Sequence, residues 1–202
     1  MSSRGRRDAT TTPSTGPVHD PIRAAFVSVR PLRIPGAVLI ECDRAVDRRG
    51  RFDTFWESAD FHAAGVRFSP QSGHHAHTER AATLRGMHYQ RAPHAQARLV
   101  ACASGRVWDV VLDLRRDSPT YLQWEGTELE PLAGHALFVP RGCAHGYVTL
   151  EDRSTVTYLI EGAYEPRAAA VVRWNDPAVR IAWPVSEPIL SDRDRTAPDF
   201  VP

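Results

Sequence analysis

The stretch 84–100, LRGMHYQRAPHAQARLV, places groups that can move protons and bind anions inside two expected short strands. These groups are Arg85, His88, Gln90, His94, Gln96 and Arg98. Imidazole titrates near neutrality, and guanidinium forms strong hydrogen bonds with carboxylates and phosphates. A half-buried strand keeps apolar residues on one face. The stretch is therefore either a polar outer face or the wall of a pocket.

A second polar position follows a turn pattern. Residues 134–145, GHALFVPRGCAH, fit the spacing G-x5-P-x-G-x2-H, which is typical of strand–turn–strand segments in cupin jelly rolls. Gly and Pro set such a turn, and the histidine, here His145, then points into the barrel. The alternative interpretation is an ordinary hairpin with a structural histidine.

A catalytic metal would need clustered ligands, and HHAHTE (74–79) is the densest histidine run. Its His75, His77 and Glu79 are spaced too tightly for the ligand set of metal-binding cupins. Imidazole clusters suit zinc and iron, but histidine runs are also common on surfaces. We expect no metal. A metal-dependent or binding-only cupin stays as an alternative, resting on His74, His75, His77 and His145.

Size and charge exclude several classes of protein. A chain of 202 residues with 42% hydrophobic residues fits one domain with its own core, and a net charge of +1 gives no electrostatic case for binding nucleic acid. No apolar run reaches the roughly 20 residues of a membrane helix, and the first residues lack the apolar centre of a secretory signal. Cys42, Cys102 and Cys143 form no CxxC pair, so we expect reduced thiols in a cytoplasmic protein.

Short strands must position the polar groups. Residues 1–24 lack apolar periodicity and are expected to be a disordered tail, with one domain over 25–202. Segments rich in Val, Leu, Thr and aromatics, separated by Gly, Pro and Asp, predict strands at 37–42, 50–56, 83–89, 96–103, 106–114, 121–128, 135–140, 146–150 and 154–161. A single helix is expected around 55–64, with short turns in 174–195. This pattern predicts an all-β sandwich, barrel or jelly roll.

The segment 106–114 has two distinct faces when read as a strand. One face carries Val107, Asp109, Val111 and Asp113. The other face is wholly apolar and carries Trp108, Val110, Leu112 and Leu114.

Ordered blocks along the chain lead to a family. The sequence resembles the dTDP-4-dehydrorhamnose 3,5-epimerases and the related 3-epimerases of nucleotide-linked 4-keto-6-deoxysugars, from about Cys42 to Phe200. The matching blocks are DRRGRF (47–52), LRGMHYQ (84–90), PHAQARLV (93–100), GRVWDVVLDLRRDSPTYLQW (105–124), FVPRGCAHGYV (138–148), YLIEGAYEP (158–166), RWNDPAVRIAWP (173–184) and PILSDRD (188–194). The resemblance implies a cupin-type double-stranded β-helix (jelly roll), a homodimer with an exchanged strand, a nucleotide-sugar substrate, no metal and no cofactor.

The resemblance also implies catalytic roles for three residues. Epimerisation beside a carbonyl needs a base on one face of the sugar, an acid on the other, and a positive group near the carbonyl oxygen. His88 matches the family base, and Asp194, in SDRD, matches the carboxylate that pairs with it. Tyr158 matches the proton donor on the opposite face, with Tyr164 as its nearest rival. A glycine within the strand, Gly86, predicts a bulge that would bring Arg85 and His88 to one face.

The same resemblance implies a substrate-binding set, in which several positions depart from the family. The set comprises Arg49, Arg85, Arg98, His145, Arg193 and His75. Arg98 stands where the family has Lys near the keto oxygen, in a sequence that contains no lysine. Thr54 replaces a Glu, Gly73–His75 replaces Gln-x-Asn, and Ala169 replaces an acidic residue.

These observations predict a cofactor-independent epimerase. It would act at carbon 3, alone or together with carbon 5, of a nucleotide-linked (dTDP) 4-keto-6-deoxyhexose in deoxysugar or natural-product biosynthesis. The altered binding positions leave one enzymatic alternative. In it, the same fold and base perform isomerisation, cyclisation or elimination on a different carbonyl compound.

Overall fold

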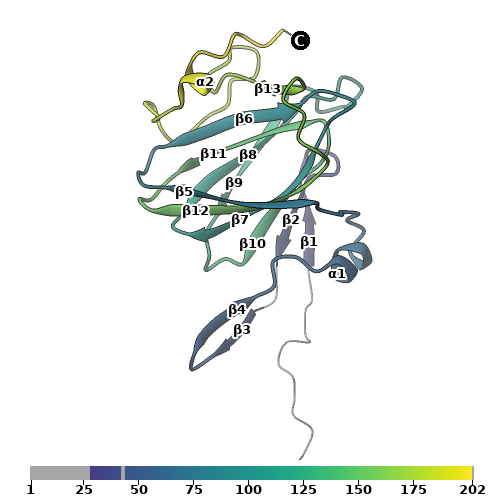
Figure 1. Cartoon of the computed structure of the whole chain (residues 1–202), viewed down its shortest axis with the longest axis vertical. Helices are drawn as coiled ribbons and strands as arrows, with labels where there is room; N and C mark the ends of the chain where they lie inside the picture. Colours follow the sequence, from purple (N-terminus) through teal and green to yellow (C-terminus); the bar gives the residue numbers. More distant parts are fainter. Residues whose placement is uncertain (1–27, 42–43, 202) are drawn as a thin grey trace, which may run out of the picture.

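The computed structural model describes residues 28–41 and 44–201, and the expected tail at 1–24 lies outside this range. Its body is a sandwich of two antiparallel sheets (Figure 1). One sheet has the order β1 (Ser28–Pro31), β2 (Val38–Glu41), β10 (His135–Val139), β7 (Ala97–Ser104), β12 (Ser154–Glu161) and β5 (Ser72–Thr78). The other has the order β13 (Ala169–Val171), β6 (Leu84–Gln90), β11 (Cys143–Thr149), β8 (Val107–Asp113) and β9 (Trp124–Leu129). The predicted all-β class is confirmed.

Among the described residues, four elements lie outside the two sheets. The strands β3 (Arg44–Asp47) and β4 (Gly50–Asp53) form a hairpin that extends away from the sandwich, on the side opposite the short helix α2 (Asp192–Arg195) (Figure 1). Helix α1 (Ser58–Ala63) confirms the helix expected around 55–64. In the described part of the chain, no helix is long and apolar enough to cross a membrane.

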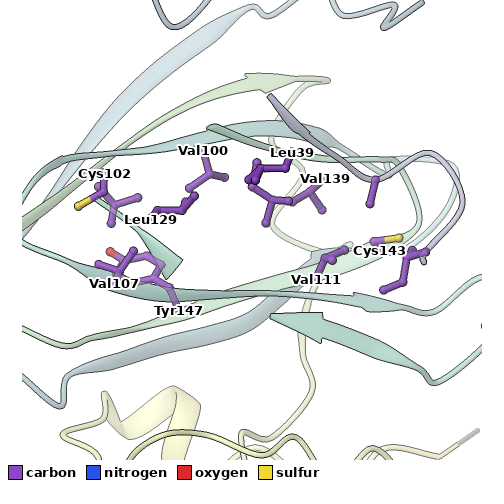
Figure 2. Close-up of a cluster of buried hydrophobic side chains, with 13 residues drawn as sticks. Leu39, Val100, Cys102, Val107, Val111, Leu129, Val139, Cys143 and Tyr147 are labelled. Carbon is purple, nitrogen blue, oxygen red and sulfur yellow. The ribbon is translucent and has the colours of Figure 1, made fainter. Parts of the chain in front are cut away.

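The core between the sheets is made of aliphatic side chains from both of them. Figure 2 shows Val100, Leu39 and Val139 from one sheet facing Val107 and Val111 from the other. All five are almost fully buried. Burial of such side chains contributes roughly 1.5–3 kcal/mol each to folding, so this layer fixes the spacing of the two sheets.

Each sheet also has a covered outer face. Phe61 of α1 and Phe68 pack on the β2–β10–β7 face, where the rings of Phe68 and Phe138 meet edge to face with centroids 5.4 Å apart. On the other sheet, Val110 and Leu112 pack under the C-terminal segment. The wholly apolar face of β8 therefore points outward beneath this segment, and the face that carries Asp109 points between the sheets.

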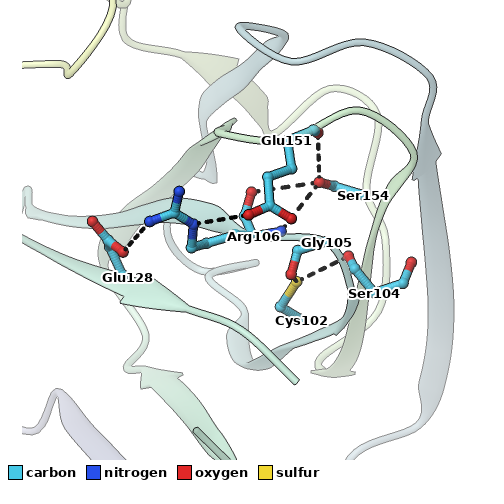
Figure 3. Close-up of polar contacts among 7 residues, drawn as sticks. All are labelled: Cys102, Ser104, Gly105, Arg106, Glu128, Glu151 and Ser154. Carbon is cyan, nitrogen blue, oxygen red and sulfur yellow. Dashed lines mark hydrogen bonds and ion pairs between the residues drawn. The ribbon is translucent and has the colours of Figure 1, made fainter. Parts of the chain in front are cut away.

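The corner between β7 and β8 is held by polar contacts. In Figure 3 the Cys102 thiol points at the carbonyls of Ser104 and Gly105, at 3.2 and 3.5 Å. Arg106 forms ion pairs with Glu128 and Glu151, each at 3.2 Å. Cys102 and Cys143 are free and buried, and burial raises the pKa of their thiols to about 11 and about 12. Cys42 lies outside the described residues.

Every predicted strand range overlaps an observed strand, but β1, β3, β5 and β13 were not predicted. The strand β5, SGHHAHT, is the largest omission because its composition is polar. It forms because it pairs along its whole length with β12, from Ser72 opposite Ile160 to Thr78 opposite Ser154. A tertiary partner thus overrides the weak local strand preference.

Candidate active site

A pocket of about 750 Å³ opens between the two sheets. Strands β5, β7 and β12 form one wall, β6 and β11 form the facing wall, and residues 189–194 contribute to the rim. Arg85, His88 and Arg98 of the opening stretch all line this pocket. That stretch is therefore a pocket wall, and the alternative of a polar outer face is wrong.

A bulge in β6 brings Arg85 and His88 to the same side. The residues opposite them on β11 are Tyr147 and His145, so β6 advances three residues while β11 advances two. Gly86 occupies the bulge at φ +139°, where a Cβ would lie 2.5 Å from the Cα of Gly146. Only glycine accommodates this backbone and this close approach. The bulge predicted at Gly86 is confirmed.

His88 is paired with a buried carboxylate. Its Nε2 lies 2.7 Å from Oδ1 of Asp194, and the backbone N–H of Gly86 approaches Oδ2 at 3.4 Å. Burial disfavours the charged form of Asp194, but the hydrogen bond and charge of His88 outweigh it and hold the pKa of this carboxyl below its usual value. The pair therefore combines an ionised carboxylate with an imidazole whose side chain is 36% exposed to the pocket.

The segment that carries Asp194 is itself fixed. Ser191 caps α2, and its Oγ accepts a hydrogen bond from the Asp194 N–H at 3.2 Å. Within the described residues, Nδ1 of His88 has no hydrogen-bond partner. Because Asp194 accepts a hydrogen bond from Nε2–H, the tautomer with a free Nδ1 is favoured. This nitrogen is available to take a proton from a bound molecule.

Tyr158 faces His88 from the other sheet. It projects from β12 into the same pocket, so a molecule bound there lies between a phenol and an imidazole. Tyr164 also lines the pocket, but it is 67% exposed at the rim. The position of Tyr158 suits a proton donor on the face opposite His88, whereas that of Tyr164 suits contact with an outer part of the ligand.

Three guanidinium groups line the pocket without a carboxylate partner among the described residues: Arg85, Arg98 and Arg193. Arg85 is oriented by Thr78 Oγ1 at 3.3 Å and by the carbonyl of His77 at 3.4 Å. Arg98 donates to the His88 carbonyl at 3.2 Å, and burial lowers the pKa of its guanidinium. Guanidinium stays protonated in proteins, so the pocket presents positive charge to a ligand.

A second histidine–aspartate pair stands in the pocket wall, where His145 lines the pocket and Asp109 is fully buried. Nε2 of His145 lies 2.8 and 3.0 Å from the two carboxylate oxygens of Asp109. Burial raises the pKa of Asp109, and its contact with His145 offsets this only in part. Sequence reasoning did not single out Asp109. Its place on the β8 face shared with Val107 and Val111, opposite the wholly apolar face, was the available signal.

The amides of the opening stretch have structural roles. Gln90 donates to the carbonyls of His94 and Ala163 and accepts from the N–H of Glu165. Gln96 donates to the carbonyl of Gly162. These bonds hold the loop after β12, which carries Tyr164.

Two expected binding residues are not brought to this pocket within the chain. Arg49 lies on the β3–β4 hairpin and pairs with Asp47 at 2.6 Å. His75 lies on the outer face of β5, where its Nδ1 is 2.8 Å from Thr157 Oγ1. His74 lines the pocket in its place, because successive residues of a strand point to opposite faces.

The histidine run does not form a metal-ligand cluster. His74 points into the pocket, whereas His75 and His77 are stacked on the opposite face with ring centroids 6.2 Å apart. Across residues 28–41 and 44–201, no three His, Cys, Asp or Glu side chains come together as potential metal ligands. The geometry therefore does not favour the metal-dependent alternative.

Known proteins of one family are similar to this chain over most of its length. A family model described as dTDP-4-dehydrorhamnose 3,5-epimerase matches residues 31–201. The dTDP-4-dehydrorhamnose 3,5-epimerase of Mycobacterium tuberculosis is 36% identical over 177 residues, which span 86% of this chain and 88% of that protein.

Solved structures are similar over the same region. The epimerase of Bacillus anthracis, crystallised with TDP and PPi bound, has a TM-score of 0.84 and 36% identity, covering 86% of this chain and 99% of that one. ChmJ, a 3'-monoepimerase of Streptomyces bikiniensis in complex with dTDP-quinovose, has a TM-score of 0.78 and 36% identity, covering 84% and 86%. The predicted cupin-type jelly roll is confirmed by this similarity. The chain belongs to the dTDP-4-dehydrorhamnose 3,5-epimerase family and is thus a sugar epimerase, an isomerase.

Proposed function

We propose that the protein epimerises a dTDP-linked 4-keto-6-deoxyhexose at carbon 3, with carbon 5 as a second position, using His88 as base and Tyr158 as acid. The observation that carries the proposal is that the His88–Asp194 pair and Tyr158 line one pocket from facing sheets. Inversion at carbon requires this arrangement, since the proton must leave from one face and return to the other.

The reaction needs no group beyond the side chains of the pocket. Nδ1 of His88 takes the proton from a carbon beside the keto group, and the electrons of the C–H bond move onto the carbonyl oxygen. The enolate then takes a proton from the Tyr158 hydroxyl on the opposite face, leaving a phenolate. Asp194 stabilises the imidazolium formed in the first step.

The enolate oxygen needs a positive partner, and we assign this role to Arg98. Its guanidinium lines the pocket and is anchored on the backbone of the base through the His88 carbonyl, 3.2 Å away. A buried charge of fixed position stabilises developing negative charge with little reorganisation. Arginine keeps its proton, so in this chain the group acts as an electrostatic stabiliser and not as a proton donor.

The diphosphate is assigned to Arg85 and Arg193, with His145 as a further contact inside the pocket. Arginine binds phosphate through paired hydrogen bonds. The TDP carrier is supported by the relatives, because the Bacillus anthracis structure holds TDP and the ChmJ structure holds dTDP-quinovose.

We further propose that the protein works as a homodimer in which the β3–β4 hairpin of each copy reaches the other. Val46 and Phe52 of this hairpin are 74% and 55% exposed, which favours their burial against a partner. Arg49 is carried on the same hairpin, away from the pocket of its own chain. In a dimer of this kind it would be free to join the binding set of the second copy.

Proton exchange tests the proposed reaction. Wild-type protein incubated with dTDP-4-keto-6-deoxyglucose in heavy water should place deuterium on carbon 3, and deuterium on carbon 5 would show that both centres react. Binding of dTDP by calorimetry should accompany the exchange. Intact binding without exchange at either carbon, beside an active control epimerase, would reject epimerisation. Absence of both binding and exchange would instead favour a different carbonyl substrate.

A further inference from the structure

His74 and Tyr158 form a cross-strand pair at the edge of the pocket. They stand directly opposite each other in the β5–β12 register, on strands that lie side by side in Figure 1. Their rings are stacked, with centroids 5.3 Å apart and planes 25° apart. Directly opposite side chains are close enough to restrain one another, so the imidazole limits the orientations of the phenol ring.

Alternate side chains of β5 point to opposite faces of the sheet, so only one histidine of the 74–77 run lies on the pocket side. Ser72, His74 and Ala76 line the pocket, whereas His75 and His77 point to the outer face and contact Thr157 and Thr155. His74 is held from its other side, since its Nε2 lies 3.3 Å from Ser72 Oγ. Among the three histidines of the run, His74 alone contacts the group proposed to return the proton.

We propose that His74 is a positioning residue that holds the Tyr158 hydroxyl toward the reacting carbon. This inference rests on the proposed function of Tyr158 as the acid. A phenol that delivers a proton to carbon must be aimed at one face of a planar enolate, and a misplacement of about 1 Å costs up to about 10²-fold in rate. A tyrosine side chain rotates about two bonds, and stacking against a restrained imidazole removes part of that freedom.

The proposal predicts an effect on one step only. If His74 aims Tyr158, its loss slows reprotonation on the far face and leaves proton removal by His88 intact. The informative quantity is therefore the ratio of net inversion to deuterium exchange at the same carbon. A residue that only stabilises the sheet would leave this ratio unchanged.

The experiment compares three variants in heavy water. His74→Ala removes the stack and should lower the ratio of inversion to exchange by about tenfold. His74→Phe restores a flat ring and should return the ratio to within about twofold of wild type, because stacking needs no titratable group. His77→Ala removes a histidine from the outer face of the same strand and should leave the ratio at its wild-type value.

Three results would overturn the inference. An unchanged ratio in His74→Ala would reduce the stack to an ordinary contact of the sheet. A raised KM with an unchanged ratio would assign His74 to binding, and a His74→Phe variant as defective as His74→Ala would exclude stacking as the cause. Failure of the proposed function itself is recognised separately, since wild-type protein would then catalyse neither exchange nor inversion.

Discussion

Two histidine–aspartate pairs with similar donor–acceptor distances place a histidine in the wall of one pocket. His88 Nε2 lies 2.7 Å from Asp194, and His145 Nε2 lies 2.8 Å from Asp109. Their surroundings differ, because the His88 side chain is 36% exposed and that of His145 is 7% exposed. The first carboxylate comes from a helix of four residues near the C-terminus, and the second comes from the strand next to its histidine.

The pKa values of the two carboxyl groups are shifted in opposite directions. The pKa of Asp194 is lowered because contacts with His88, Gly86 and Ser191 overcome its burial. The pKa of Asp109 is raised because its burial is complete and His145 offsets it only in part. A similar distance thus supports different chemistry. The pair with the accessible His88 imidazole suits proton transfer, and the more deeply buried His145–Asp109 pair suits a fixed contact with the substrate.

The largest effect is expected from removal of the accessible imidazole. His88→Ala should lower deuterium exchange at carbon 3 by about 10²- to 10⁴-fold, the usual range for loss of a general base. Binding of dTDP should persist, because the guanidinium groups remain. His145→Ala should weaken dTDP binding and retain most of the exchange at saturating substrate. An equal loss of deuterium exchange in both variants would show that His88 and His145 do not have separate roles in proton removal and binding.

Gly86 lies next to a residue of each histidine–aspartate pair, so its replacement should disturb the geometry of both. Its N–H approaches Asp194, while an added Cβ would lie 3.0 Å from the His145 carbonyl oxygen. Strain at a positive φ together with overpacking predicts that Gly86→Ala destabilises folding by about 2–5 kcal/mol. Urea unfolding measures this loss, and Gly50→Ala, with open space around its Cβ, controls for the strain alone. Similar losses in the two variants would show that the close approach to β11 has no energetic weight.

Replacement of Asp194, the carboxylate paired with His88, should have an intermediate effect on rate. Asp194→Asn retains the shape of the pair but removes the charge that stabilises the imidazolium. We expect kcat to fall by about 10²-fold, the lower end of the range for general acid–base catalysis. KM should change little, because Asp194 is not part of the proposed binding set. The steady-state rates of purified variant and wild type provide the measurement. A wild-type kcat would remove Asp194 from the proposed mechanism.

The smallest effect is a difference in the pH dependence of stability. An aspartate with a lowered folded pKa contributes stability above its unfolded pKa of about 3.9, and that stability is lost as pH falls through the folded value. The stability difference between wild type and Asp194→Asn should therefore shrink below about pH 4.

Asp109 should show the opposite sign. A raised folded pKa contributes stability below the unfolded pKa, and this is lost as pH rises through the folded value. Asp109→Asn should therefore gain stability relative to wild type as pH rises. Urea unfolding of both variants across pH 3 to 8 measures the two trends. If the stability of both variants relative to wild type changed in the same direction with pH, the two carboxyl pKa values would not be shifted in opposite directions.

Local sequence patterns predicted the bulge at Gly86 and the positions of most strands. Gly86 was expected to mark a bulge because a glycine within a strand signals close backbone approach, and the register of β6 with β11 has this bulge. The predicted strand ranges all overlap observed strands because their β-branched and aromatic content matches a half-buried sheet.

Contacts between distant segments were less accessible from the sequence. His88 and Asp194 lie 106 positions apart, so only the family resemblance linked them. The sequence placed His74 only in the metal-binding or binding-only alternative. Its place in the pocket was not predicted, because β5 is polar and the direction of its side chains depends on pairing with β12. Asp109 went unassigned because the opposite face of β8 is wholly apolar. The sequence alone did not indicate that the face carrying Asp109 is the one that points between the sheets.

If His88 and Tyr158 act on opposite faces of one substrate, Tyr158→Phe should separate proton removal from inversion. The variant should be incubated with dTDP-4-keto-6-deoxyglucose in heavy water, with exchange and inversion at carbon 3 followed together. We expect proton removal by His88 to continue, so that deuterium enters with retention while net inversion slows much more strongly. An equal loss of exchange and inversion would show that the two residues do not act on opposite faces.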